Sequence, residues 1–350
     1  MHTSILLALV GGFIIAVIGE IIAAPFMSLL NVPDEVFPLA LIYLRIYLLG
    51  LPVIFLYNFE TAIFRSIGNT RAPLIALLLS GIINVILNLF FVIVLKLSVE
   101  GVAIATVISN AISLMILFCR LLKEDEYIRL EPKRLRIDTG TMSKIIRIGL
   151  PAGLQSGVFA FANIVIQASI NSLGTVVIAA SSAAFNIEVF VYDIINSFSQ
   201  ACTTFTGQNY GAGKKDRCRR VLYLSLIEAA VSLAVSAAIV LIFGKKLLAI
   251  FNGDKEVIDT GYIRLILIMC AYTCTFIYEV ISGYLRGFGL SLMPAILTTA
   301  GICGVRLFWI YAVFPKNRTF MTIMEAYPIS LFVTAILVLF YYAYKRKSLR

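Results

Sequence analysis

Charged residues are scarce in this chain of 350 residues, and histidine is almost absent. Asp, Glu, Lys and Arg make up 14% of the sequence, against about 25% in soluble domains. Hydrophobic residues reach 60%, and the mean hydropathy is +0.96. These values exclude an ordinary soluble globular fold, so we expect a lipid bilayer to be the main solvent of this protein.

The lack of histidine and of cysteine pairs also limits the chemistry. The only histidine is His2, so a His-dependent catalytic triad or a multi-His zinc site has no histidine within the body of the chain. The six cysteines have no CxxC spacing and lie in or beside apolar segments, which is typical of reduced packing residues. We therefore expect a protein that is not an enzyme.

Apolar runs interrupted by Gly, Pro and charged residues predict ten transmembrane helices. A helix needs about 20 mostly apolar residues to cross a bilayer. The predicted spans are 4–30, 38–64, 72–95, 101–121, 145–172, 175–207, 219–244, 258–285, 292–314 and 321–343. The sequence thus predicts an all-α, polytopic integral membrane protein.

The loop charges predict the orientation of these spans. If Met1 is cytoplasmic, the inside segments contain 20 Lys and Arg residues and the outside loops contain six. Basic residues gather in cytoplasmic loops, so both termini are predicted to be cytoplasmic, in the cytoplasmic (plasma) membrane. The net charge of +10 therefore needs no nucleic-acid partner.

The longest polar stretch divides the spans into two lobes. We expect an N-terminal lobe of four helices at 1–121, a cytoplasmic linker at 122–144, a C-terminal lobe of six helices at 145–343, and a basic cytoplasmic tail at 344–350.

The two lobes contain a sequence repeat. Shifting the chain by 219 to 221 residues matches pairs of like residues: Arg45 with Arg264, Glu60 with Glu279, Arg65 with Arg286, Gly68 with Gly289, and Pro73 with Pro294. The matched spans run in the same direction across the membrane, which predicts two parallel, pseudo-symmetric lobes, an architecture used by transporters.

Spans 145–172 and 175–207 have no counterpart in the first lobe. We interpret the chain as a twelve-helix fold without its first two helices, because a half-repeat cannot bury its polar faces alone. The alternative is a native, asymmetric ten-helix protein.

Six motifs distributed over nearly the whole chain resemble the multidrug and toxic compound extrusion (MATE) family. They are NFETAIFRSIGNTRAPL (58–74), IGLPAGLQSGVFAFANIVIQ (148–167), GQNYGAGKKDRCRR (207–220), YEVISGYLRGFGLSLMPA (278–295), VRLFWIYAVFP (305–315) and YPISLFVTA (327–335). The resemblance implies two lobes around a central cavity and a secondary antiporter that exports organic cations or drugs in exchange for Na⁺ or H⁺ by alternating access.

The resemblance also implies the partners. These are small cationic substrates and the bilayer, with the coupling ion in place of a cofactor, and we expect a monomer. Two alternatives stay open: a lipid-linked oligosaccharide flippase of the same superfamily, and a truncated membrane fragment that does not transport.

Ionisable residues within spans are the candidate site residues, since a charge in the bilayer is costly unless it faces a cavity or a partner. Helical spacing places Glu188 and Tyr192 on one face of span 175–207 and Asn186 and Asp193 on another. The full candidate set for substrate or for cation and proton coupling is Glu60, Gln155, Asn163, Asn186, Glu188, Tyr192, Asp193, Glu279 and Arg306.

Within that set we expect two specific arrangements. Glu279 and Arg306, on successive spans, are predicted to form a carboxylate–guanidinium pair. Glu188, Asp193 and Glu279 are predicted to provide a Na⁺ site or exchangeable protons. Related transporters place a carboxylate about eight residues after the proline that matches Pro151; the residues there, Val158 to Ala160, are apolar, which leaves the choice between Na⁺ and H⁺ open.

Overall fold

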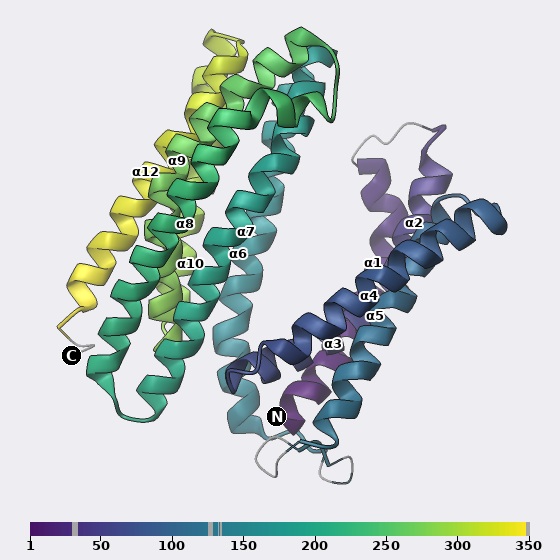
Figure 1. The fold of residues 1–350 in the computed structure, drawn as a ribbon, viewed down its shortest axis with the longest axis vertical. Helices are drawn as coiled ribbons and strands as arrows, with labels where there is room; N and C mark the ends of the chain where they lie inside the picture. The colour runs from purple at the N-terminus through teal and green to yellow at the C-terminus, as the bar shows by residue number, and fades with distance from the viewer. Residues whose placement is uncertain (30–33, 125–128, 132, 134, 348–350) are drawn as a thin grey trace. The chain divides into compact units, whose positions relative to one another are not determined.

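The structure of the chain is a computed structural model that describes residues 1–29, 34–124, 129–131, 133 and 135–347. All regular elements in this part of the chain are helices (Figure 1). The chain divides into two compact units, Met1–Ile145 and Ile146–Arg350. Residue 30 of the first predicted span, together with parts of the predicted linker and of the predicted tail, lies outside the described residues.

In its described residues, the first unit contains five α-helices and the start of a sixth. They are α1 (His2–Leu29), α2 (Phe37–Leu49), α3 (Leu51–Ser66), α4 (Arg71–Leu89), which the π-helical η1 (Phe90–Val94) extends, and α5 (Val99–Leu121). Helix α6 (Thr139–Asn171) begins in this unit and continues into the second.

The second unit continues with long helices and one irregular span. The long helices are α7 (Thr175–Gly211), α8 (Lys215–Ala249), α9 (Lys255–Gly287) and α12 (Phe320–Lys345). The irregular span consists of α10 (Leu292–Thr298), η3 (Thr299–Gly304), α11 (Val305–Phe308), η4 (Trp309–Val313) and η5 (Phe314–Lys316), where η3 and η4 are π-helical and η5 is a 3₁₀ turn.

The predicted fold class is confirmed. Nine helical segments in the described residues are long and apolar enough to cross a membrane, and α2 with α3 makes a tenth that bends by 49°. The bend follows from the sequence, because Gly50 lies at the break and Pro52, within the first turn of α3, has no N–H to continue the helical ladder.

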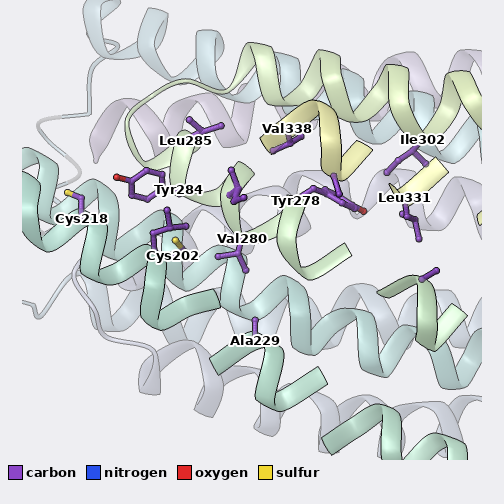
Figure 2. Packing of buried hydrophobic residues seen from close by; sticks show 14 residues of the cluster. Cys202, Cys218, Ala229, Tyr278, Val280, Tyr284, Leu285, Ile302, Leu331 and Val338 are labelled. Carbon is purple, nitrogen blue, oxygen red and sulfur yellow. The ribbon is translucent and has the colours of Figure 1, made fainter. Parts of the chain in front are cut away.

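Helices α7 and α9 form the centre of the second unit, with α8 and α12 packed beside them (Figure 1). Gly283 allows the close approach of α9 to α7, since a Cβ atom there would come within 2.4 Å of the backbone oxygen of Ser199. Figure 2 shows the apolar cluster that fills the adjoining space, in which Tyr284 lies among Cys202, Cys218 and Leu285.

The sequence repeat has a structural counterpart at two helix ends. Gly68 after α3 has φ +83° and Gly289 after α9 has φ +79°, the left-handed conformation that glycine adopts without strain. In both places the next N–H bonds to the carbonyl five residues back, at 3.0 Å, and the glycine N–H bonds to the carbonyl three residues back. Both helices therefore end in the same Schellman motif.

Candidate functional site in the second unit

A cavity of about 660 Å³ opens within the second unit, a volume typical of small-molecule sites. Its wall is mainly apolar and aromatic, with a few amide, hydroxyl and charged groups. The lining residues are Phe159, Asn163, Ile164, Ile166, Gln167, Ile178, Ser181, Ser182, Phe185, Glu188, Val189, Tyr192, Arg264, Ile268, Tyr272, Thr275, Tyr278, Arg306, Tyr327 and Leu331.

Glu188 on α7 and Arg264 on α9 form a two-pronged ion pair in the cavity wall. Arg264 Nε donates to Glu188 Oε1 at 2.7 Å, and Arg264 Nη2 donates to Glu188 Oε2 at 2.9 Å. The side chains of Arg264 and Glu188 are only 4% and 5% exposed. A planar guanidinium matches a carboxylate in this way, so the charge of Glu188 is compensated within the protein.

Arg306 lies on the short α11, between two π-helical segments. Its Nε donates to Ser330 Oγ on α12 at 3.1 Å, and its guanidinium carbon lies 4.4 Å from the ring centre of Tyr327 and 6.0 Å from that of Phe159. π-Helical turns shift the direction of side chains along a span and are frequent at functional sites. Here they flank the residue that brings a guanidinium to the cavity.

Tyr327 lies close to both arginines of the cavity. The guanidinium carbon of Arg264 is 5.5 Å from its ring centre, compared with 4.4 Å for Arg306. The negative face of an aromatic ring attracts a cation, and this ring lowers the cost of holding two positive charges in one wall.

Glu279 is connected to Tyr192 and Arg286. The Tyr192 hydroxyl donates to Glu279 Oε1 at 3.3 Å, and Arg286 Nη2 lies 3.6 Å from Glu279 Oε2. The predicted pair of Glu279 with Arg306 is therefore wrong. The side chain of Glu279 turns toward α7 and toward the end of its own helix, seven residues further on, whereas Arg306 bonds to α12.

The other predicted residues differ in whether they line the cavity. Gln155 Nε2 donates to Thr298 Oγ1 at 2.6 Å, outside the cavity wall, whereas Asn163 lines the cavity. Asn186 and Asp193 are exposed and do not line it. Of the two faces of α7 that helical spacing separates, the one carrying Glu188 and Tyr192 borders the cavity.

The three carboxylates of the predicted cation site do not gather. Glu188 pairs with Arg264, Glu279 contacts Tyr192 and Arg286, and Asp193 is exposed. Among the described residues no group of three or more acidic, histidine or cysteine side chains could hold a metal ion. The prediction of one shared site for these three residues is corrected accordingly.

Glu60 lies apart from this cavity, on α3 of the first unit. Its side chain is fully buried, and neither carboxylate oxygen has a hydrogen-bond partner among the described residues. Its position in the repeat matches that of Glu279, so the same residue type has partners in one unit and none in the described part of the other.

Arg264 and three cavity tyrosines are site residues that the sequence analysis does not identify. Arg264 carries a usable signal, because an arginine within a span needs a partner and the Tyr-x-Arg pattern repeats at Tyr43 and Tyr262. Tyr272, Tyr278 and Tyr327 give no such signal, since tyrosine also packs in ordinary helix interfaces.

The long apolar helices define a polytopic helical membrane protein, and its second unit contains an amphipathic cavity with the volume of a small-molecule site. The family model MatE matches residues 1–90 and 151–312, well over half of the chain. The chain belongs to this family, the MATE family that its motifs resemble.

Curated relatives match most of this chain. A probable multidrug resistance protein, YoeA, of Bacillus subtilis is 24% identical over 96% of this chain and 74% of its own length. An FAD transporter of Shewanella oneidensis is 27% identical over 78% of this chain and 61% of its own length. The multidrug export protein MepA of Staphylococcus haemolyticus is 26% identical over 85% and 66%. The chain thus spans about three fifths to three quarters of the length of these proteins.

Solved structures show the same fold. A MOP superfamily transporter from Pyrococcus furiosus, described as having a binding pocket of reverse polarity that suggests a different function, superposes with a TM-score of 0.90 at 20% identity. The match covers 99% of this chain and 78% of that one. An outward-facing MATE family transporter matches with a TM-score of 0.87, 20% identity and the same coverage.

Proposed function

We propose that this chain exports amphipathic organic molecules by secondary active transport, with the cavity of the second unit as its substrate site. The observation that carries the proposal is the cavity itself, which combines six aromatic side chains with three buried charged groups inside an apolar helical bundle. Charges within a bilayer are retained where they serve a cavity or a pathway.

The mechanism we propose is alternating access, in which each lobe moves as a body and the cavity opens to one side of the membrane at a time. Export would be driven by exchange with Na⁺ or H⁺. Family membership and relatives named as multidrug resistance or export proteins support this mechanism. The predicted cytoplasmic position of both termini, in the plasma membrane, belongs to the same proposal and rests on the loop charges.

The coupling group we propose is Glu279. Tyr192 lines the cavity, and its hydroxyl connects Glu279 to the cavity wall. Unlike Glu188, Glu279 has a single contact with an arginine and no pair of short hydrogen bonds to one. Its ionic partner, Arg286, is 3.6 Å away and 30% exposed, so this pair is weaker than that of Glu188 with Arg264 and can exchange more readily.

An accumulation assay tests the proposed function. Cells that express the chain are loaded with a panel of fluorescent dyes and compared with cells carrying an empty vector. We expect lower dye accumulation with the chain, lost when Tyr327 is replaced by Ala and kept in the matched control Tyr344→Ala, whose side chain is 77% exposed. Equal accumulation with the empty vector, for every dye, would overturn the proposal.

The same assay distinguishes the coupling ions. Collapse of the proton gradient should restore dye accumulation if H⁺ drives export, and replacement of external Na⁺ should do so if Na⁺ does. Glu279→Gln should abolish the response to the ion that drives export, whereas Glu325→Gln, which changes an exposed carboxylate of α12, should not.

A further inference from the structure

The charges of the cavity wall do not cancel. Three charged residues line the cavity: Glu188, Arg264 and Arg306. The first two neutralise each other at 2.7 and 2.9 Å. Glu279 and Arg286, behind Tyr192, form a second pair with no net charge. The positive charge of Arg306 is therefore the net charge of this wall.

Arg306 is 5% exposed, and a guanidinium group carries a positive charge in proteins. In the described part of the chain its partners are the hydroxyl of Ser330 and the rings of Tyr327 and Phe159, and none of them is anionic. Its Nε donates to Ser330 Oγ, so the two terminal nitrogens, Nη1 and Nη2, keep their N–H donors for other acceptors.

A buried guanidinium without a counter-ion is costly unless something compensates it. Arg306 borders a cavity large enough for an organic molecule. A carboxylate or phosphate group in the cavity would accept two parallel hydrogen bonds from its terminal nitrogens and neutralise the charge. An organic cation would instead meet a positive wall in which the one carboxylate is already bound by Arg264.

We propose that the cavity of the second unit selects amphipathic organic anions, whose carboxylate or phosphate group binds the terminal nitrogens of Arg306 while the aromatic side chains hold the apolar body. This proposal rests on the transport function proposed above and names its substrate class. It replaces the organic cations predicted from family resemblance with molecules of the opposite charge.

Two dyes with the same ring system and opposite charge test the proposal. Fluorescein is an anion, and the methyl ester of tetramethylrhodamine is a cation. Binding to the purified 350-residue chain is followed by fluorescence anisotropy, with detergent alone as the blank. We expect fluorescein to bind at least about tenfold more tightly than the rhodamine ester. Equal affinity, or tighter binding of the cation, would overturn the proposal.

Variants locate the anion site. Arg306→Gln should weaken fluorescein binding about tenfold, Arg306→Lys should weaken it less because the charge remains, and the control Arg318→Gln, on an exposed loop, should leave it unchanged. An unchanged affinity in a monodisperse Arg306→Gln protein would contradict the assignment. If that variant does not fold, the comparison of the two dyes on the unmodified chain still decides.

Competition identifies the acidic group. Displacement of bound fluorescein by phenyl phosphate or by benzoate supports the proposal and shows which acid the site prefers, whereas equal displacement by benzylamine, a cation of similar size, would count against it. The proposed function fails separately: a chain that exports the rhodamine ester but does not bind fluorescein retains the transport function and loses only the anion assignment.

Discussion

The two units use matching residues in different ways. Arg264 of the second unit is 4% exposed and holds Glu188 at 2.7 Å, whereas its repeat counterpart Arg45 in the first unit is 51% exposed and lies 3.6 Å from Glu20. Glu279 has hydrogen-bond and ionic partners, and its counterpart Glu60 has none among the described residues. The partners that differ come mainly from α7, which carries both Glu188 and Tyr192. In the second unit, α7 therefore supplies partners to both Arg264 and Glu279.

The largest expected effect comes from breaking the ion pairs made by the two matching arginines. Glu188→Gln should lower the free energy of unfolding by about 3–5 kcal/mol, because it leaves Arg264 buried without a counter-ion. Glu20→Gln should cost at most about 1 kcal/mol, because its pair is partly solvated. Denaturant unfolding in detergent, followed through the fluorescence of Trp309, measures the effect of Glu188→Gln. Limited proteolysis of the first unit measures the effect of Glu20→Gln. Equal costs would show that burial does not separate the two pairs.

A second comparison should change sign between the units. Glu60→Met should stabilise the chain by about 1–3 kcal/mol, because it replaces a buried carboxyl group without a partner among the described residues by an apolar side chain of similar length. Glu279→Gln should destabilise it, because it loses the ionic contact with Arg286 and weakens the bond from Tyr192. Thermal unfolding of the two variants, measured side by side, tests this; a loss of stability in both would mean that Glu60 has a partner that compensates its charge.

The shared helix ends should respond alike. Gly68→Ala and Gly289→Ala each force a side chain into a left-handed conformation, so each should cost about 1 kcal/mol. No atom outside the local chain lies within 4 Å of the added Cβ at either site among the described residues, so neither variant introduces a clash there. Melting temperatures that differ strongly between the two variants would show that the repeated turns do not have equivalent surroundings.

The smallest expected effect is pH-dependent and lies at the start of α6. Hydrogen bonds from Thr141, including its backbone N–H to Asp138 Oδ1 at 2.7 Å, hold the pKa of Asp138 below its ordinary value of 3.8. Because the folded-state pKa is lowered, the stabilisation is complete above pH 3.8 and disappears as the pH falls through the folded value. Asp138→Ala should therefore lower the melting temperature slightly at neutral pH and not at strongly acidic pH. A difference that persists in acid would exclude the carboxylate as its cause.

The helices depend on local properties and are therefore accessible from the sequence. A run of about 20 apolar residues must form a helix in lipid, since each backbone group needs a partner within its own segment. Gly68 and Gly289 likewise mark the ends of two helices in the sequence itself, because only glycine adopts the required φ without strain. The helical period separates the cavity-facing Glu188 and Tyr192 from the exposed Asn186 and Asp193, although it does not show which face borders the cavity.

The partners of the charged residues depend on the tertiary structure. Arg306 and Glu279 lie on successive spans, and sequence distance favours their pairing, yet the π-helical turns around α11 direct Arg306 to Ser330 and Tyr327. Arg264 reaches Glu188 because Gly261 and Gly283 on α9 allow a close approach to α7. The sequence by itself determined which residues must avoid lipid. Only the packing of the helices decided which opposite charge each of them meets, because ion pairing depends on distances of a few ångströms between helices that are far apart in the chain.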